Sequence, residues 1–433
     1  MRVAMIGAGY VGLVSGACFA DFGHIVTCID VDEAKIAGLK EGRMPIYEPG
    51  LAELVATNVR AGRLSFTTDL AQGIAGAEAI FIAVGTPSRR GDGHADLTYV
   101  FQAARDVARH LDGFAVVVNK STVPVGTGDE VERIIRAEAP QAEFAVASNP
   151  EFLREGAAIG DFKRPDRIVI GVEDARAEAV LKELYRPLFL NQAPILVTSR
   201  RTAELIKYAA NAFLATKITF INEIADLCEK VGANVQDVAR GIGLDRRIGP
   251  KFLNAGPGYG GSCFPKDTLA LIRTAEEHGS PLRIVAATVE ANTRRKRAMG
   301  EKVIRAMGGD VRGRTIAILG LTFKPETDDM REAPSIDIIE VLQAAGARIV
   351  AHDPEGEEQA RRILKDVEYR PDAYSAVEGA DAMVIVTEWD EFRALNLARI
   401  RTLLREPVVV DLRNIYRREE MDRHGFRYTA VGR

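Results

Sequence analysis

Short apolar runs alternate with longer mixed segments through the first half of the chain. Each run has the length of a strand and leads into glycine, proline or small polar residues. Continuous apolar runs of this length are typical of strands that are buried on both faces of a parallel sheet. The pattern therefore predicts an α/β fold with a doubly wound sheet. The runs expected to form its strands are residues 2–6, 25–29, 79–84, 115–120, 145–148, 167–172 and 195–197.

A different pattern begins at residue 202. Residues 202–232 contain no proline and no internal glycine, which predicts one helix of about 45 Å. Further helices are expected to about residue 300, and a second, smaller doubly wound sheet after that. Its strands are expected at residues 315–319, 348–351, 382–386 and 407–410. The three expected domains are a nucleotide-binding Rossmann domain over residues 1–198, a central helical domain over 199–300 and a Rossmann-like domain over 301–433.

The composition removes several classes of function. The chain has 433 residues and a net charge of −4, which argues against a surface built for nucleic acid. No apolar run approaches the ~20 residues needed to cross a bilayer, and the first residues lack the features of a signal peptide. The four cysteines and six histidines are scattered, so neither a disulfide framework nor a metal cluster is expected. We expect a cytoplasmic, reduced, metal-free protein without a nucleic-acid or membrane partner.

A glycine-rich turn directly follows the first expected strand. In the pattern G-x-G-x-x-G, Gly7 makes the tight turn, Gly9 lets a pyrophosphate approach the backbone, and Gly12 lets the helix pack on the strand. Asp30 ends the next strand, where a carboxylate accepts hydrogen bonds from a ribose and repels a 2′-phosphate. The pattern favours NAD over NADP, although Lys35 nearby weakens that preference.

Polar residues also follow other expected strands, at the edge where open parallel sheets bind ligands. Thr86, Thr122, Glu151 and Glu155 are candidates for contacts with a cofactor or substrate, and the alternative is that they cap helices or form turns. Lys324 follows the first strand of the second sheet, where it would lie near a nucleotide phosphate.

Residues 256–261 contain four glycines and lead into Cys263, Lys266 and Asp267. A glycine-rich loop could bind a phosphate or a sugar. The nearby cation Lys266 would favour the thiolate form of Cys263, and Asp267 could orient a water. The alternative is a turn with an inert buried cysteine. On the long helix, Lys207 and Asn211 lie four positions apart and share a face. Cys18, Cys28 and Cys228 lie in apolar segments and are expected to be structural.

These motifs together resemble the UDP-glucose 6-dehydrogenase branch of the UDP-glucose/GDP-mannose dehydrogenase family, over essentially the whole chain. The resemblance implies two Rossmann-like domains joined by a long central helix, NAD as cofactor, UDP-glucose as substrate, and a homodimer or higher homo-oligomer. The motifs that carry it are G-x-G-x-x-G at 7–12, GTP at 85–87, STVP at 121–124, NPEFL at 149–153, K-x-x-x-N at 207–211, GGSCFPKD at 260–267 and G-x-x-x-K at 320–324.

The resemblance also implies roles. Cys263 would add to an aldehyde, pass through a thiohemiacetal and end as a thioester that is hydrolysed, so that two NAD are reduced for each UDP-glucose. Lys207 and Asn211 would stabilise oxyanions, Asp267 and Thr122 would hold a water, and Glu151 would act as an acid or base. The implied cofactor contacts are Gly7, Gly9, Val11, Gly12, Asp30, Lys35, Thr86, Thr122, Glu155, Lys266 and Arg331. The implied substrate contacts are Glu151, Phe152, Leu153, Arg154, Glu155, Lys207, Asn211, Arg247 (across a dimer interface), Phe252, Leu253, Asn254, Ala255, Gly256, Gly260 and Lys324.

Three other functions stay open at this point. Sibling enzymes that act on GDP-mannose or a UDP-N-acetyl-hexosamine share the cysteine, although Ser262 departs from the histidine that the UDP-N-acetyl-mannosamine branch usually has there. A two-electron β-hydroxyacid dehydrogenase would share the Lys-x-x-x-Asn helix but not Cys263. A non-catalytic NAD-sensing or scaffold protein would need none of these residues.

Overall fold

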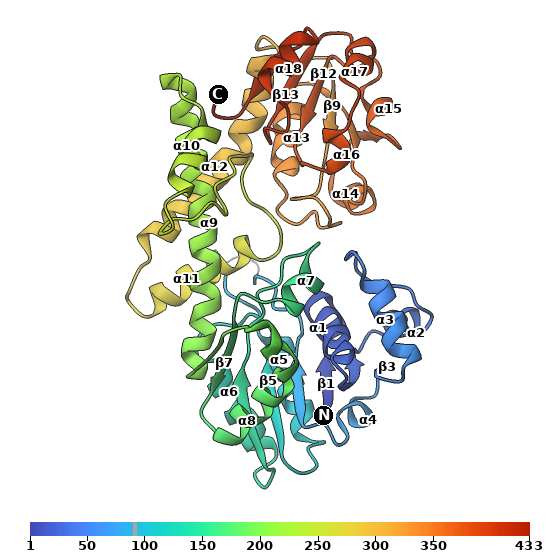
Figure 1. Ribbon diagram of the computed structural model, residues 1–433, viewed down its shortest axis with the longest axis vertical. Helices are drawn as coiled ribbons and strands as arrows, with labels where there is room; N and C mark the ends of the chain where they lie inside the picture. The colour runs from blue at the N-terminus through green and yellow to red at the C-terminus, as the bar shows by residue number, and fades with distance from the viewer. Residues whose placement is uncertain (90–92) are drawn as a thin grey trace. The chain divides into compact units, whose positions relative to one another are not determined.

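The computed structural model describes residues 1–89 and 93–433, and these form two compact units (Figure 1). The first unit is Met1–Ala210 with Leu269–Ser280, and the second is Asn211–Thr268 with Pro281–Arg433. Each unit is built around one sheet with helices on its faces.

The sheet of the first unit has eight strands in the order β3-β2-β1-β4-β5-β6-β7-β8. Its first six positions have the strand order of dinucleotide-binding folds, with the switch point between β1 and β4. All neighbouring strands are parallel except β6 and β7, which are antiparallel. The strands are β1 Arg2–Ile6, β2 Ile25–Ile29, β3 Leu64–Thr67, β4 Ala79–Ile82, β5 Ala115–Asn119, β6 Phe144–Ser148, β7 Ile168–Val172 and β8 Ile195–Thr198.

Helices cover both faces of this sheet, which explains its continuous apolar strands. In β1, Val3 and Met5 belong to one buried cluster, and Ala4 and Ile6 belong to the cluster on the opposite face. The helices are α1 Tyr10–Asp21, α2 Glu33–Lys40, α3 Leu51–Arg60, α4 Leu70–Ile74, α5 Thr98–Ala108, α6 Thr127–Glu138, α7 Ala158–Lys163 and α8 Ala175–Leu184, with a 3₁₀ turn over Arg186–Asn191.

The predicted long helix is confirmed as α9, a single helix of 32 residues over Arg200–Val231. Its first part belongs to the first unit and the remainder to the second. Three further helices follow before the second sheet: α10 Val235–Gly243, α11 Phe264–Glu277 and α12 Arg283–Ala306.

The second sheet has six parallel strands in the order β11-β10-β9-β12-β13-β14. This repeats the order of the first six positions in the other unit, so its switch point lies between β9 and β12. The strands are β9 Thr315–Leu319, β10 Arg348–His352, β11 Val367–Tyr369, β12 Ala382–Ile385, β13 Val408–Asp411 and β14 Arg427–Ala430. The helices are α13 Pro334–Ala344, α14 Glu357–Ile363, α15 Ala373–Val377, α16 Asp390–Arg393, α17 Leu397–Leu403 and α18 Arg418–Arg423.

The predicted fold class is confirmed, with local corrections. The sequence analysis missed β3, β11 and β14, which are short strands at sheet edges whose partly exposed positions interrupt the apolar run. Helix α1 begins at Tyr10, so its first turn lies inside the glycine motif. The three predicted domain boundaries stay predictions.

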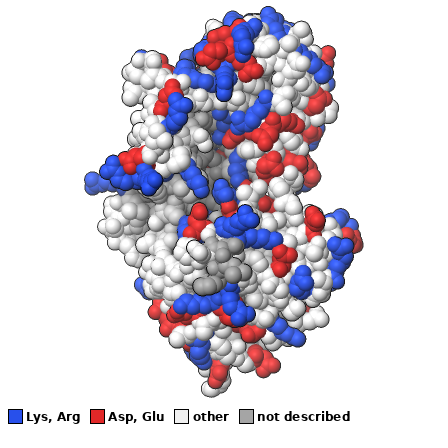
Figure 2. All heavy atoms as spheres, in the orientation of Figure 1, with Lys and Arg blue, Asp and Glu red and all other residues white. Residues whose placement is uncertain are grey.

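The surface carries charges of both signs. Figure 2 shows acidic and basic side chains interspersed over the face that it presents, in keeping with the small net charge. Among the described helices, none is both long and apolar enough to cross a membrane. The expected cytoplasmic location stays a prediction.

Candidate active site

The glycine turn between β1 and α1 has the geometry of a pyrophosphate cradle. A Cβ on Gly7 would lie 2.5 Å from the carbonyl oxygen of Ala83, and a Cβ on Gly12 would lie 1.8 Å from that of Gly7. A Cβ on Gly9 would meet nothing within 4 Å. The first and third glycines are therefore needed for packing, whereas the second leaves open space beside the first turn of α1, where amide groups favour a phosphate.

Asp30 is held at the end of β2, where a ribose would bind. Its Oδ2 accepts hydrogen bonds from the Ala8 amide at 2.9 Å and from Lys35 Nζ at 2.8 Å. Burial acts to raise the pKa of Asp30, but the hydrogen bonds from Lys35 and from the Asp32 and Ala8 amides outweigh it, so the pKa is lowered. Lys35 is thus paired with the carboxylate. The glycine turn and this aspartate fit NAD.

The ends of β4 and β5 are joined beside this turn. Thr86 Oγ1 donates to the carbonyl oxygen of Thr122 at 3.0 Å, and Ser121 Oγ donates to that of Val84 at 2.7 Å. Thr86 is buried and Thr122 is partly exposed. Both predicted contact residues therefore lie at the carboxyl-terminal edge of the first sheet.

The loop after β6 is fastened by Glu48, a residue that the sequence analysis missed. The Glu48 carboxylate accepts the Gly156 amide at 2.6 Å and the Ala158 amide at 2.8 Å, and it bonds the hydroxyl of Tyr10. This places the loop that contains Glu155 beside the first turn of α1. Glu48 lies in a stretch without an apolar period, so only the folded chain reveals its role.

Lys207 and Glu151 form a buried ion pair in the first unit. Lys207 Nζ lies 3.0 Å from Glu151 Oε1, and both side chains are at least nine-tenths buried. The other Glu151 oxygen accepts the amide of Leu153. Lys207 also lies 5.4 Å from the ring of Phe152. The structure thus brings together a predicted cation and a predicted acid that are 56 positions apart in sequence.

A second buried lysine, Lys120, lies behind this pair. Its Nζ donates to Asn149 Oδ1 at 3.0 Å and to the Tyr185 hydroxyl at 3.1 Å. Burial lowers the pKa of Lys120 from 10.5 to about 8; Glu151 opposes that shift and Lys207 adds to it. Sequence analysis missed Lys120 because it looks like the end of an apolar strand.

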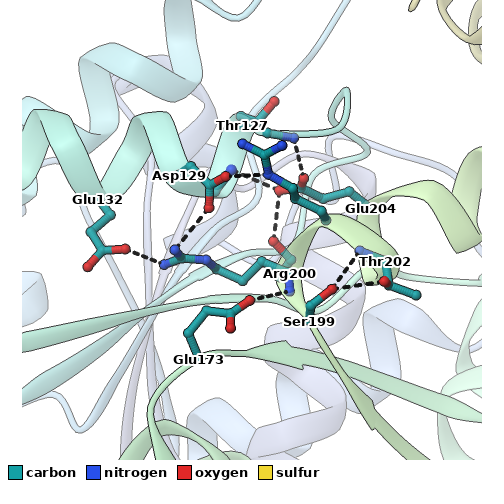
Figure 3. A network of polar contacts seen from close by, with 12 residues as sticks. Thr127, Asp129, Glu132, Glu173, Ser199, Arg200, Thr202 and Glu204 are labelled. Atoms are coloured by element: carbon teal, nitrogen blue, oxygen red, sulfur yellow. Dashed lines mark hydrogen bonds and ion pairs between the residues drawn. The ribbon is translucent and has the colours of Figure 1, made fainter. Parts of the chain in front are cut away.

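The start of α9 is fixed by a polar network (Figure 3). Glu204 accepts the amides of Gly126 at 2.7 Å and Gly128 at 2.8 Å, and the hydroxyl of Ser148 at 2.9 Å. Arg200 pairs with Asp129 at 2.9 Å, as Figure 3 also shows. The network therefore ties α9 to the N-terminus of α6, one turn before Lys207.

Cys263 lies at the N-terminal end of α11 in the second unit, where helix amides favour an anion. It is partly exposed, whereas Cys18, Cys28 and Cys228 are buried, as predicted. Asp267, in the first turn of the same helix, is buried. One of its oxygens accepts Asn211 Nδ2 at 2.6 Å and the other pairs with Lys266 Nζ at 2.6 Å.

The segment that follows β9 packs tightly on the loop before Cys263, within the second unit. A Cβ on Gly260 would lie 2.3 Å from the carbonyl oxygen of Glu332, and a Cβ on Gly261 would lie 2.8 Å from the Phe323 ring. The Gly261 amide donates to the carbonyl oxygen of Arg331 at 2.8 Å. The cysteine loop is thus joined to the segment that follows β9, which includes Lys324 at the second switch point.

Other predicted contact residues face solvent or structural partners. The Arg247 side chain is 89% exposed and forms an ion pair with Asp245. Arg154 forms an ion pair with Asp161. Arg331 pairs with Asp329. Phe252 has a φ of 64°, which is unusual for a residue with a side chain. Val11 is partly buried, Leu253, Ala255 and Gly256 are buried, and Asn254 is exposed.

The two doubly wound sheets, the glycine cradle and its tethered aspartate define a nicotinamide-dinucleotide-dependent oxidoreductase with a second nucleotide-type domain. Comparison with known proteins identifies the family. Residues 1–189 match the NAD binding domain of the UDP-glucose/GDP-mannose dehydrogenase family, residues 201–294 its central domain and residues 317–418 its UDP binding domain. The chain belongs to this family, as the sequence motifs predict, and the predicted NAD cofactor is confirmed.

Individual relatives extend over the whole chain. A UDP-glucose 6-dehydrogenase of Rhizobium meliloti is 66% identical over 435 residues and covers 100% of both chains. The solved structure of a UDP-glucose dehydrogenase from Pyrobaculum islandicum is 42% identical, with a TM-score of 0.91 and coverage of 99% of this chain and 96% of that one. A UDP-D-ManNAc dehydrogenase from Pyrococcus horikoshii is 28% identical, with a TM-score of 0.87 and coverage of 100% and 99%.

Proposed function

We propose that the protein oxidises UDP-glucose to UDP-glucuronate with two NAD. The observation that carries this proposal is Cys263, the partly exposed cysteine that directly precedes α11, four residues before a buried Asp267 whose two oxygens are both hydrogen-bonded. A two-electron alcohol dehydrogenase would need no such thiol. Support for the substrate comes from the similarity to enzymes named for UDP-glucose, which exceeds the similarity to one named for UDP-D-ManNAc.

The nucleotides would bind at the two switch points. We infer that Gly7, Gly9 and Gly12 hold the NAD pyrophosphate and that Asp30 holds its ribose, with Thr86 and Glu155 nearer the nicotinamide. The UDP-sugar would be held by Lys324 and by the backbone of residues 252–256 and Gly260. Each NAD, when bound, would accept one hydride, so two NAD molecules are used in turn.

The chemistry balances for four electrons. The C6 alcohol loses a hydride and a proton and becomes an aldehyde. The Cys263 thiolate adds to the aldehyde carbon to give a thiohemiacetal oxyanion, which loses the second hydride and becomes a thioester. Water attacks the thioester carbon, the carbon–sulfur bond breaks, and a carboxylate and the thiolate remain. The sum is one alcohol, one water and two NAD⁺, giving one carboxylate, two NADH and three protons.

Buried charged side chains would stabilise the oxyanion and orient the water in these steps. We infer that Lys207, held by Glu151, stabilises the oxyanion of the thiohemiacetal together with Asn211. Asp267, which is fixed by Asn211 and Lys266, would orient the water for the first oxidation and for hydrolysis, with Thr122 as a second water contact. Glu151 would exchange protons during hydrolysis.

We also propose a homodimer through α9. Phe213, Phe220 and Leu227 are spaced by seven positions, so they lie on one face of the helix, and they are 66%, 50% and 53% exposed. Val231, one turn further, is 65% exposed. A row of large exposed apolar side chains on one face of a helix matches a second copy of the same helix. Arg247, which is exposed in the same unit, would then be available to the partner's substrate.

The stoichiometry of NADH tests the reaction. We expect two NADH for each UDP-glucose consumed, and no turnover with Cys263→Ala although NAD still binds. One NADH for each UDP-glucose would mean that oxidation stops at the aldehyde, and unchanged turnover of Cys263→Ala would contradict the covalent path. Turnover with GDP-mannose alone would move the chain to the sibling activity. No turnover with either would favour another UDP-sugar or a non-catalytic role.

A further inference from the structure

Side chains from two helices hold the glycine-rich loop before Cys263. The Gly256 amide donates to Asn222 Oδ1 of α9 at 2.9 Å, and the Gly256 carbonyl oxygen accepts Arg295 Nε of α12 at 2.6 Å. Both side chains are more than nine-tenths buried. Both polar groups of this glycine are therefore bonded to side chains that lie far from it in sequence.

Asn292 makes a similar two-point contact with Tyr259. The Tyr259 amide donates to Asn292 Oδ1 at 2.9 Å, and Asn292 Nδ2 donates to the Tyr259 carbonyl oxygen at 3.0 Å. Between the two held residues, Gly258 has a φ of 117°, and a Cβ there would lie 2.9 Å from Asn292 Oδ1. The side chain of Asn292 can reach the loop only because position 258 is glycine.

Arg295 is itself fixed. Its Nη1 donates to the carbonyl oxygen of Asn222 at 3.0 Å and pairs with Asp226 Oδ1 at 2.9 Å, so α9 and α12 are joined at the point where they hold the loop. The next residue of α12, Lys296, donates to the Glu332 carbonyl oxygen at 2.9 Å. Glu332 is the residue whose carbonyl excludes any side chain at Gly260.

We propose that Asn292 and Arg295 are positioning residues for the Cys263 thiol, which they control through the backbone of residues 256–260. The proposal rests on the proposed function, because it assigns them to the step in which Cys263 attacks the aldehyde. Neither residue needs to touch substrate. Their loss would release the loop, so the thiol would become more accessible to a small reagent while losing the alignment that attack on a bound aldehyde requires.

The test uses the full-length protein and three single-residue variants of α12. Asn292→Asp keeps the size and the acceptor but places a carboxylate oxygen against the Tyr259 carbonyl, and Asn292→Ala and Arg295→Ala remove the contacts. The matched controls are Thr293→Ala and Arg294→Ala, because Thr293 bonds its own helix and Arg294 is 71% exposed and pairs with Glu290. The readouts are kcat with UDP-glucose, KM for NAD, and the rate at which iodoacetamide alkylates each cysteine, followed by mass spectrometry.

We expect kcat to fall by about 10- to 100-fold in the three variants, with KM for NAD unchanged and alkylation of Cys263 several-fold faster. Cys228 is the internal control, because it is buried in α9 within the same unit. Parallel alkylation of Cys228 would show general loosening and overturn the positioning role, as would variants with kcat and Cys263 alkylation like the wild type. If the wild type itself shows no turnover, the proposed function fails, while the selective change in Cys263 alkylation still tests the hold on the loop.

Discussion

At the scale of single residues, Lys120 of the first unit is a buried lysine with no carboxylate at hydrogen-bonding distance. Lys120 is bonded to an amide oxygen and a phenol, which are neutral partners. A buried ammonium with neutral partners costs free energy, and its lowered pKa of about 8 expresses that cost. Its contacts nevertheless fix Asn149, two positions before Glu151.

We expect Lys120→Met to change the pH dependence of stability. Between about pH 8 and pH 10.5 the unfolded chain keeps the proton on Lys120 and the folded chain loses it, so the unfolding free energy of the wild type rises with pH through this window. Across this window the unfolding free energy of the wild type should rise by on the order of 3 kcal/mol relative to that of the variant, which has no proton to lose there. Tyr185 still donates to Asn149 in the variant.

Thermal unfolding at several pH values provides the measurement. The Tm of the wild type should rise relative to that of Lys120→Met as the pH increases from about 7 to about 10. Glu151 and Lys207 are the charged groups that act on Lys120, and both the wild type and Lys120→Met keep them. A constant difference in Tm across the range would show that Lys120 does not titrate there.

At the scale of elements, one carboxylate joins the start of α9 to α6. Glu204 accepts two amides of the first turn of α6 and the Ser148 hydroxyl, although burial raises the pKa of this carboxyl. A Cβ on Gly128 would lie 3.0 Å from Glu204 Oε1, so the glycine permits the contact. The join sets where Lys207 lies relative to the ends of β5 and β6.

Glu204→Ala should loosen this contact between α9 and α6 locally, because three donors, two of them buried, lose their acceptor. The free energy of local opening should fall by about 3 kcal/mol, and hydrogen exchange at residues 126–131 should accelerate accordingly. Glu223→Ala is the matched control, since Glu223 is an exposed glutamate on the same helix. Equal exchange in the two variants would contradict a structural role for Glu204.

Contacts between segments that are distant in sequence mark the limit of what the sequence predicts. The glycine cradle, the tethered aspartate and α9 follow from local patterns, because their cause lies within one stretch of chain. Lys207 and Glu151 were predicted as candidates but not as a pair, since the contact is between distant segments. Asn292 and Arg295 gave no signal at all, because a polar residue on a helix looks exposed until the loop that it holds is placed.

At the scale of the whole molecule, the exposed row on α9 predicts the assembly state. Phe213→Glu with Phe220→Glu should convert a dimer into a monomer, because carboxylates replace the apolar centre of the proposed interface. Light scattering after size-exclusion chromatography measures the mass directly. Leu244→Glu is the control, since Leu244 is 80% exposed but lies outside α9. A wild type that is monomeric at micromolar concentration would contradict the proposal.

The division of the chain into units has a consequence for its synthesis. The first unit is made of residues 1–210 and 269–280, and residues 270 and 271 of the later piece are buried. A ribosome therefore releases the glycine-rich loop and Cys263 before the last piece of the cofactor unit exists. Nascent chains that stop between residues 210 and 269 carry an incomplete nucleotide-binding unit, so a premature stop there would truncate both units of the protein together.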